Sequence, residues 1–340
     1  MPTLVLYSRL AFYPVHWLAL EEIVRRYDVR TVPPGPRRTR LAWIARQLRD
    51  IDPDAIWVQE EPIDPFLLEM LALYRFRKRP RIVTAVCENI FPRPRRFAER
   101  AARRLLWPRL DHLLTVAGPS LAGIRAAGMP TSVAASTLVA GGLEPDGDVT
   151  AMALPFDRSG DFVVGFAGRL VEEKGWRVLV RALPDGAHLV LAGDGPQRTE
   201  LEALAAENER IHYLGLLPKD ELWGFYAALD CLAVPSLTTP RWQEQSASTL
   251  VDGLCMGLPI VASSSGGIPD IMGRAGLLVP EGDADALRDS LARVREYPAL
   301  RAELCGAGKE RYRREFAVPV YADKIAAALN LHVRPLALGT

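Results

Sequence analysis

The chain has 340 residues, a length that accommodates roughly two domains of about 150 residues, each with its own core. Apolar residues make up 49% and charged residues 24%, with a formal net charge of +1, which excludes disordered and collagen-like proteins. The four cysteines are widely spaced and form no CxxC pair, so we expect reduced thiols in a cytoplasmic protein. Met1 to Ser8 do not have the pattern of a signal peptide, and we expect no transmembrane segment.

Short apolar, β-branched runs alternate with longer helical patterns along the chain, which predicts parallel sheets built from βαβ units. In the first half we predict strands at Thr3–Tyr7, Val29–Val32, Ala55–Gln59, Arg81–Val86, His112–Ala117 and Ser132–Leu138. In the second half we predict them at Phe162–Ala167, His188–Ala192, Ile211–Leu214, Cys231–Val234, Pro259–Ala262 and Gly276–Val279.

A stretch rich in Gly and Pro, from Ala140 to Gly160, separates the two halves and has the composition of a linker. We therefore predict one Rossmann-like domain over residues 1–150 and a second over residues 151–319. A helix pattern follows Pro319, and we expect residues 320–340 either to cap the second domain or to cross back to the first.

The strand at Phe162–Ala167 leads through Gly168 and Arg169 to Lys174 and then into a helix pattern. A glycine turn between a strand and a helix presents free backbone N–H groups, and two cationic side chains add full positive charges. This arrangement predicts an anion site suited to a diphosphate, although surface cations beside an ordinary turn give the same pattern.

Two further glycine turns follow strand ends, one at Gly193 and Gly195 and one at Gly215. Loops at the carboxyl ends of parallel strands meet at one edge of the sheet, so we expect these turns to line one crevice. The GxGxxG pattern is absent from both turns, which argues against NAD or FAD binding.

Two carboxylates flank a predicted helix start in the segment after Pro235 and Ser236. Glu244 precedes that helix, Ser246 or Ser248 is expected to be its N-cap, and Asp252 lies within it. The arrangement predicts a site at the helix N-terminus, with a solvated acidic helix face as the alternative.

In this order and spacing, the segments between Phe162 and Gly282 resemble the retaining glycosyltransferases of family 4, which have the GT-B fold. The resemblance implies an α/β fold of two Rossmann-like domains facing each other across a cleft. It implies that Arg169 and Lys174 bind the diphosphate of a nucleotide sugar, that Glu244 addresses the sugar, and that Asp252 holds the ribose. The other residues expected to bind the donor are Gly168, Gly195, Leu216, Leu217, Gln245, Ser246, Ala247 and Ser248.

The sequence departs from the family pattern close to both carboxylates. Asp252 stands where the family usually has Glu, and Ser246-Ala247 stand where it usually has Phe-Gly. We therefore expect a reshaped sugar pocket, and the identity of the donor is not carried over from the resemblance.

The resemblance implies an enzyme that transfers a hexose-type sugar from an NDP-sugar to an acceptor hydroxyl with retention of anomeric configuration. The acceptor is expected on the first domain, where Glu88 and His16 are candidate catalytic residues. Two alternatives are a nucleotide-sugar epimerase of the same architecture and a catalytically inert sugar-nucleotide-binding protein.

We expect neither a metal nor another cofactor, because Arg169 and Lys174 supply positive charge at the diphosphate. Pairs of Asp at 52 and 54, 146 and 148, and 283 and 285 do not follow strand ends in the way that a metal-diphosphate site requires. Nucleic acid is not expected as a partner.

Residues 75–109 are rich in Arg, with seven arginines against one acid between Arg93 and Arg109, interleaved with apolar side chains. This pattern indicates a weak peripheral contact with an anionic membrane surface at the inner face, and a solvated basic helix gives the same pattern.

Overall fold

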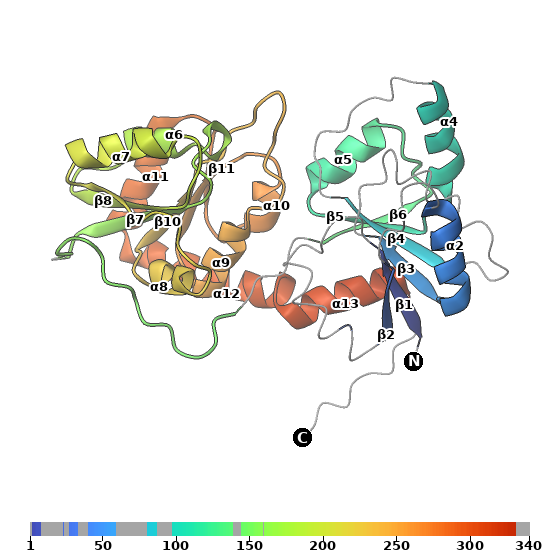
Figure 1. The fold of residues 1–340 in the computed structure, drawn as a ribbon. Coiled ribbons are helices and arrows are strands. Elements are labelled where there is room, and N and C mark those ends of the chain that lie inside the picture. The colour runs from blue at the N-terminus through green and yellow to red at the C-terminus, as the bar shows by residue number, and fades with distance from the viewer. Residues whose placement is uncertain are drawn as a thin grey trace. The chain divides into compact units, whose positions relative to one another are not determined.

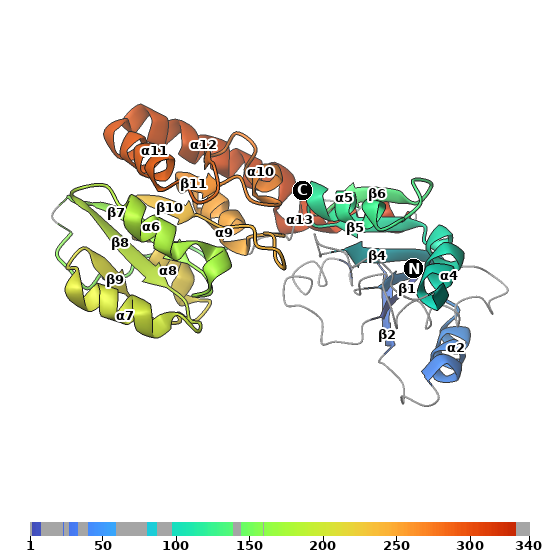
Figure 2. The same ribbon diagram turned by 90° about the horizontal axis from the view of Figure 1, so that it is seen from above.

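The structure is a computed structural model, and it describes residues 2–7, 23, 27–32, 40–58, 80–86, 97–138, 144–158 and 160–330. The chain divides into two compact units. The first comprises Met1–Gly141 together with Val318–Thr340, and the second comprises Gly142–Ala317. Each unit contains a six-stranded sheet with helices packed against it (Figures 1 and 2).

The sheet of the first unit is parallel throughout and has the strand order β2-β1-β3-β4-β5-β6. Its strands are β1 (Thr3–Tyr7), β2 (Asp28–Val32), β3 (Ala55–Val58), β4 (Arg81–Val86), β5 (His112–Thr115) and β6 (Ala134–Thr137). Its helices are α2 (Arg40–Ile51), α4 (Phe97–Leu106), α5 (Gly118–Ala126) and α13 (Val318–Leu329), with a short 3-10 turn η2 (Trp107–Arg109).

Successive side chains of a strand point to opposite faces of the sheet, and helices bury both faces of this one. In β1, Val5 belongs to a cluster with side chains of α2 and α5, and Leu6 belongs to a second cluster with side chains of α13. The Arg81 guanidinium donates a hydrogen bond of 2.7 Å to the carbonyl of Ala328. The last helix therefore returns from the second unit and completes the core of the first.

The sheet of the second unit is also parallel, with the strand order β12-β11-β10-β7-β8-β9. Its strands are β7 (Phe162–Ala167), β8 (Ala187–Ala192), β9 (Ile211–Tyr213), β10 (Cys231–Val234), β11 (Ile260–Ser263) and β12 (Leu277–Val279). Its helices are η3 (Glu172–Lys174), α6 (Trp176–Ala182), α7 (Arg198–Glu207), α8 (Glu221–Ala227), α9 (Ser248–Met256), α10 (Ile268–Met272), α11 (Ala284–Glu296) and α12 (Pro298–Glu315).

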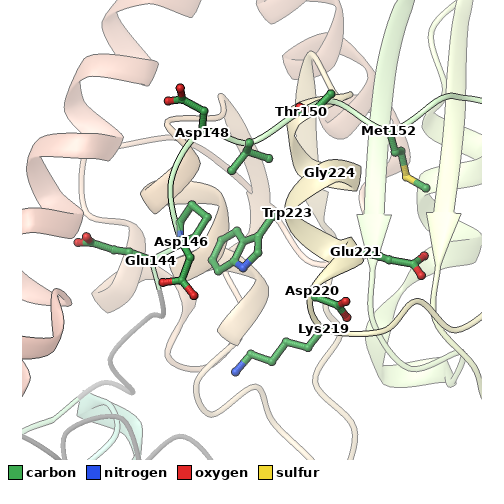
Figure 3. Close-up of a pocket in the computed structure, with 12 residues that line it drawn as sticks. Glu144, Asp146, Asp148, Thr150, Met152, Lys219, Asp220, Glu221, Trp223 and Gly224 are labelled. Carbon is green, nitrogen blue, oxygen red and sulfur yellow. The ribbon is translucent and has the colours of Figure 1, made fainter.

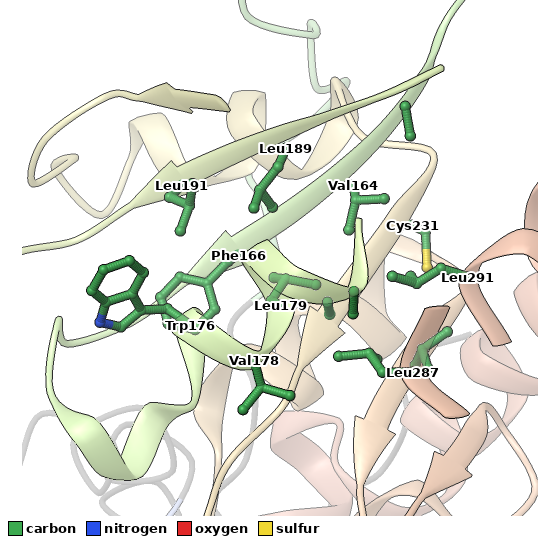
Figure 4. Close-up of a cluster of buried hydrophobic side chains, with 14 of the residues drawn as sticks. Val164, Phe166, Trp176, Val178, Leu179, Leu189, Leu191, Cys231, Leu287 and Leu291 are labelled. Atoms are coloured by element: carbon green, nitrogen blue, oxygen red, sulfur yellow. The ribbon is translucent and has the colours of Figure 1, made fainter. Parts of the chain in front are cut away.

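Helices cover both faces of this sheet, with α6 and α7 on one side and α8 and α9 on the other (Figure 1). Figure 4 shows the core on the first of these faces, where Phe166 of β7, Leu189 of β8 and Cys231 of β10 meet apolar side chains of α6 and α11. Trp176, the first residue of α6, is fully buried there. The core fixes the strand ends from which the loops of the candidate site extend.

The predicted fold class is confirmed, since both halves form parallel α/β sheets of Rossmann-like layout. Each predicted strand is present, and its ends differ from the prediction by at most two residues. The described part of the predicted linker, residues 144–158, contains neither helix nor strand. Among the residues that the structure describes, no helix is both long and apolar enough to cross a membrane.

Candidate active site

The candidate site lies where the strand order of the second sheet reverses. Strands β7 and β10 are central neighbours, and the later strands extend from them in opposite directions, with β8 and β9 on one side and β11 and β12 on the other. Loops at such a switch point diverge to opposite faces and leave a crevice at the carboxyl ends of the strands. Gly168 and Arg169 follow β7 there, and Ser236 follows β10.

The turn after β7 is pressed against the end of β10 at a glycine. Gly175 has a φ of +67°, and a Cβ atom on it would lie 1.8 Å from the carbonyl oxygen of Pro235. Only glycine tolerates both the left-handed backbone and this close approach. The contact brings Lys174, the residue before it, next to the loop that follows β10.

Lys174 and Glu244 form the central ion pair of the site. The Lys174 ammonium lies 2.7 Å from Oε2 of Glu244, and the hydroxyl of Ser236 donates a hydrogen bond of 2.7 Å to the same oxygen. Glu244 is only 3% exposed. The ammonium also lies 4.7 Å from the ring centroid of Trp242, at the distance of a cation–π contact. A buried carboxylate is thus held by a cation that faces a cavity.

The backbone around Glu244 is fixed as well, because its carbonyl oxygen accepts a 2.9 Å hydrogen bond from the N–H of Gly267. Helix α9 then begins at Ser248, with Ala247 at the N-cap and no side-chain hydrogen bond to the cap. The predicted cap at Ser246 or Ser248 is therefore wrong. The N–H groups of the first turn are not capped by the Ala247 side chain, and the positive end of the helix favours anions.

Asp252 lies one turn further along α9 and is largely buried. The hydroxyl of Tyr226, in α8, donates a 3.4 Å hydrogen bond to its Oδ2 atom. Burial raises the pKa of Asp252 to about 6, against the opposing effects of the Lys219 charge and the Tyr226 hydrogen bond. Burial and the neighbouring Asp252 also raise the pKa of the Tyr226 hydroxyl. This carboxyl group therefore changes its charge close to neutral pH.

Two cavities join around Arg169. One has a volume of about 280 Å³ and is lined by Ala167, Gly168, Arg169, Ala192, Gly193, Asp194, Leu216, Leu217, Leu222, Tyr226, Ser248, Thr249 and Asp252. The other, of about 230 Å³, is lined by Phe166, Ala167, Gly168, Arg169, Lys174, Ala233, Val234, Ser236, Glu244, Ser246, Ala247, Ser248 and Thr249. Gly168, Arg169 and the first residues of α9 line both, so the cavities form one trough with the start of α9 at its centre.

Arg169 is more exposed than Lys174, the other cation of this trough. Its side chain is 62% exposed and lies 3.4 Å from a carboxylate oxygen of Glu173. An exposed pair of this kind contributes little to stability, so the guanidinium is available to an entering anion at small cost.

The structure brings ten of the predicted residues to this trough, namely Gly168, Arg169, Lys174, Leu216, Leu217, Glu244, Ser246, Ala247, Ser248 and Asp252. Gly195 and Gln245 line neither cavity. A Cβ atom on Gly195 would lie 2.5 Å from the carbonyl oxygen of Leu170, so this glycine permits two turns to pack together. His16 and Glu88 lie outside the described residues.

Sequence reasoning missed Tyr226, Leu222 and Thr249, which also line the trough. Leu222 and Tyr226 are four residues apart on α8, so the helical period places both on one face. That spacing, read together with the glycine turn before α8, was the available signal. Thr249 is the second residue of α9, so its place in the trough follows from the start of this helix at Ser248.

A larger hollow, of about 800 Å³, lies elsewhere on the second unit, between residues 144–152 and the start of α8 (Figure 3). Its lining includes Trp223, Asp146, Asp148, Glu221 and a single cation, Lys219. An excess of carboxylates repels a diphosphate, so we do not place the donor there. The described residues contain no group of three or more His, Cys, Asp or Glu side chains that could hold a metal ion.

The sequence of the second unit matches a known family. Residues 161–296 match the family "Glycosyl transferases group 1". The chain is 36% identical over 173 residues to the 2-deoxystreptamine glucosyltransferase of Streptomyces kanamyceticus. The matched region covers 47% of this chain and 43% of that protein. It is 27% identical over 182 residues to a GDP-mannose-dependent phosphatidylinositol monomannoside mannosyltransferase of Corynebacterium glutamicum, covering 51% of this chain and 48% of that protein. The matched part thus spans about half the length of these relatives.

The whole fold is similar to solved structures. The crystal structure of Anabaena Alr3699/HepE in complex with UDP superposes with a TM-score of 0.72 at 18% identity and covers 97% of this chain and 100% of that chain. At this identity the similarity establishes the architecture. The chain therefore has the GT-B fold, and its residues 161–296 match the family of the group 1 glycosyl transferases.

Proposed function

We propose that the protein transfers a hexose-type sugar from a nucleoside-diphosphate sugar to an acceptor hydroxyl with retention of anomeric configuration. The observation that carries this proposal is the trough itself, in which Arg169 lines both cavities, Asp252 lines one of them, and Lys174 and Glu244 line the other. Two cations between two hydrogen-bond acceptors match a donor whose diphosphate lies between a ribose and a sugar.

In this proposal the diphosphate binds at the start of α9, where Ser248 and Thr249 line both cavities. The bond between the anomeric carbon and the diphosphate oxygen breaks as the sugar is transferred, and negative charge develops on the leaving diphosphate. Arg169, Lys174 and the N–H groups of the helix stabilise that charge. These groups are fixed by the protein, so they supply the positive charge that a metal ion provides in other transferases.

Glu244 has two functions in this account. In the free protein its buried carboxylate holds Lys174 in place at 2.7 Å. With the donor bound, it faces the sugar from the wall of the 230 Å³ cavity and accepts hydrogen bonds from sugar hydroxyls. Ser236 keeps the carboxylate in one orientation through its own 2.7 Å hydrogen bond.

Asp252 lies at the opposite end of the trough, in the cavity that Leu216 and Leu217 also line. We assign it to a ribose hydroxyl, which donates to a carboxylate. The nucleobase then passes the backbone near Leu216 and Leu217. The relatives include enzymes named for GDP-mannose and the solved structures include one with UDP, so the donor nucleotide is left open between uridine and guanosine.

The acceptor belongs to the first unit in this proposal, and His16 and Glu88 are retained as candidates there. Retention follows from the resemblance to family 4. The assay is incubation with UDP-glucose, UDP-N-acetylglucosamine or GDP-mannose and a panel of hydroxyl acceptors, with the anomeric proton of the product followed by NMR. An epimerase would change the donor without any acceptor, and an inert binding protein would bind the donor and release no product.

A second proposal concerns the surface around α4. Arg100, Arg104 and Arg109 are exposed, and Leu105 between them is 57% exposed. Arg103 is buried and lies 5.1 Å from the ring of Trp107, so it does not belong to this surface. A basic surface with an apolar side chain suits weak binding to an anionic lipid leaflet. We propose such a contact as a means of bringing the enzyme to an acceptor at a membrane.

A further inference from the structure

The ammonium group of Lys174 has an aromatic ring as a second partner besides its carboxylate. Its nitrogen lies 4.7 Å from the ring centroid of Trp242 and 2.7 Å from Oε2 of Glu244. The Lys174 side chain is only 20% exposed, so little water screens the cation from either neighbour. A cation over an aromatic face is attracted to the negative side of the ring quadrupole, and a Trp ring gives the strongest contact of this kind.

A tight hairpin carries the Trp242 ring. The backbone groups of Thr239 and Trp242 form two hydrogen bonds with each other, of 2.8 and 3.3 Å, and the Thr239 hydroxyl accepts a further bond of 3.0 Å from the Trp242 N–H. The residue before the hairpin is fixed as well, since the N–H and the hydroxyl of Thr238 donate to the two carboxylate oxygens of Glu281 at 2.6 and 2.7 Å. The backbone that carries the ring is therefore preformed.

Trp242 contacts a residue of the trough without lining the trough itself. Lys174 and Glu244 are among the residues that line the cavity of about 230 Å³, whereas Trp242 is among the lining residues of neither cavity. An effect of the ring on a ligand in the trough thus passes through Lys174.

The chemistry of Lys174 explains what a neutral second partner contributes. An ammonium has three N–H donors at the end of a flexible stem, and Glu244 accepts from one of them. A second carboxylate would cancel the charge that a diphosphate needs, whereas an aromatic ring attracts the ammonium and leaves its positive charge in place. The ring therefore restricts the cation and leaves it able to donate to a phosphate oxygen.

We propose that Trp242 is a positioning residue for the diphosphate site: its ring holds the Lys174 ammonium at the cavity, so that the cation meets the diphosphate of the donor already in place. This inference rests on the proposed function, since it needs a diphosphate in the trough. It assigns a role in donor binding to an aromatic side chain that lies outside both cavities.

The test compares Trp242→Leu with Trp242→Phe by isothermal titration with UDP and GDP. Both changes shorten the side chain, and only Phe retains an aromatic face. For the nucleotide that binds, Trp242→Leu should raise the Kd roughly three- to tenfold, and Trp242→Phe should raise it by no more than about twofold. In the background Lys174→Met/Glu244→Gln, which has neither the ammonium nor an unpaired carboxylate, Trp242→Leu should change the Kd by less than about 1.5-fold.

Urea unfolding of the ligand-free proteins measures the contact itself. Trp242→Leu should lower the midpoint of unfolding more in the wild-type background than in the background Lys174→Met/Glu244→Gln, because only the first has a cation over the ring. A fall of the same size in both backgrounds would show that the ring contributes only apolar packing and would overturn the inference.

The titration outcomes separate this inference from the proposed function. If the wild-type protein binds UDP or GDP and Trp242→Leu binds it equally well, or if the Leu and Phe variants weaken binding to the same extent, the role of Trp242 is overturned and the transferase proposal stands. Weaker binding of a sugar nucleotide with an unchanged Kd for the nucleoside diphosphate also overturns it, because the ring would then contact the sugar. If the folded wild-type protein binds neither nucleotide, the proposed function fails and the positioning role fails with it.

Discussion

The titration of Asp252 gives a quantitative prediction for nucleotide binding. Its pKa of about 6 means that roughly one-tenth of the carboxyl groups are ionised at pH 5 and nearly all are ionised at pH 7.5. If only the carboxylate accepts the hydrogen bond from a ribose hydroxyl, the fraction of protein molecules able to bind the nucleotide falls with the ionised fraction of Asp252 as the pH is lowered. The Kd for UDP or GDP should therefore rise roughly tenfold between pH 7.5 and pH 5 through this group alone.

The raised pKa of Asp252 also makes the stability of the folded protein depend on pH. The pKa in the folded protein lies above the ordinary value of 3.8, so the neutral form of Asp252 favours folding. That contribution is fully present below about pH 4 and is lost as the pH rises through about 6. Asp252→Asn removes the titrating group, and we expect the ligand-free variant to have the higher Tm at pH 7.5.

The assay is titration calorimetry with UDP and GDP from pH 5 to pH 8, with Asp252→Asn as the reference. Both proteins share the titration of the ligand phosphate, so the ratio of their Kd values isolates Asp252. The ratio should change about tenfold between pH 7.5 and pH 5, with the change beginning near pH 6. A ratio that stays constant over this range would refute the assignment of the ribose to Asp252.

Four further predictions concern the diphosphate, the ion pair, metal ions and the basic surface. Arg169→Ala should lower kcat by roughly 10²-fold with little change in stability, because the side chain is 62% exposed, and a kcat equal to wild type would exclude it from the site. Lys174→Ala leaves the buried Glu244 without its cation and should lower the free energy of unfolding in urea by about 3 kcal/mol. The double variant Lys174→Ala/Glu244→Gln should recover at least half of that loss, because it no longer contains the unpaired carboxylate. An equal loss of stability in the single and double variants would refute the role of the ion pair. Turnover should persist in excess EDTA, and activity that is lost and then restored by Mg²⁺ or Mn²⁺ would show that a metal is needed. In co-sedimentation at low salt, anionic liposomes should bind the wild-type protein and not Arg100→Glu/Arg104→Glu, with no binding to neutral lipid; equal binding to both lipids would count against the α4 surface.

The sheets could be predicted from sequence because their strands are apolar on both faces. The run Leu4-Val5-Leu6 and the run Ala55 to Val58 are buried throughout, as parallel strands covered by helices on both sides require. The path of the last helix could not be predicted. Its apolar residues Tyr321 and Ile325 mark a buried face but do not say which sheet it covers, and that choice depends on the shape of a core made by distant strands.

The candidate site was predictable where a charge stands beside a turn, as for Arg169 and Lys174. The ion pair between Lys174 and Glu244 could not be predicted from the sequence. The two residues are 70 apart in the chain, and their contact depends on the close approach of Gly175 to Pro235. The predicted N-cap of α9 was wrong because Ser246 and Ser248 both have the hydroxyl group that N-cap positions favour. In the structure the cap is Ala247, and Ser246 is one of the residues that line the smaller cavity.

In the proposed function, the trough around Arg169 binds a nucleoside diphosphate through Asp252 at one end. The most direct measurement is the Kd of UDP and of GDP for the wild-type protein and for Asp252→Ala at pH 7.5. We predict that one nucleotide binds the wild-type protein and that Asp252→Ala weakens this binding by about 1.5 to 3 kcal/mol, or roughly ten- to a hundredfold. Binding of equal strength to both proteins, or no binding of either nucleotide to the folded wild-type protein, would contradict the account.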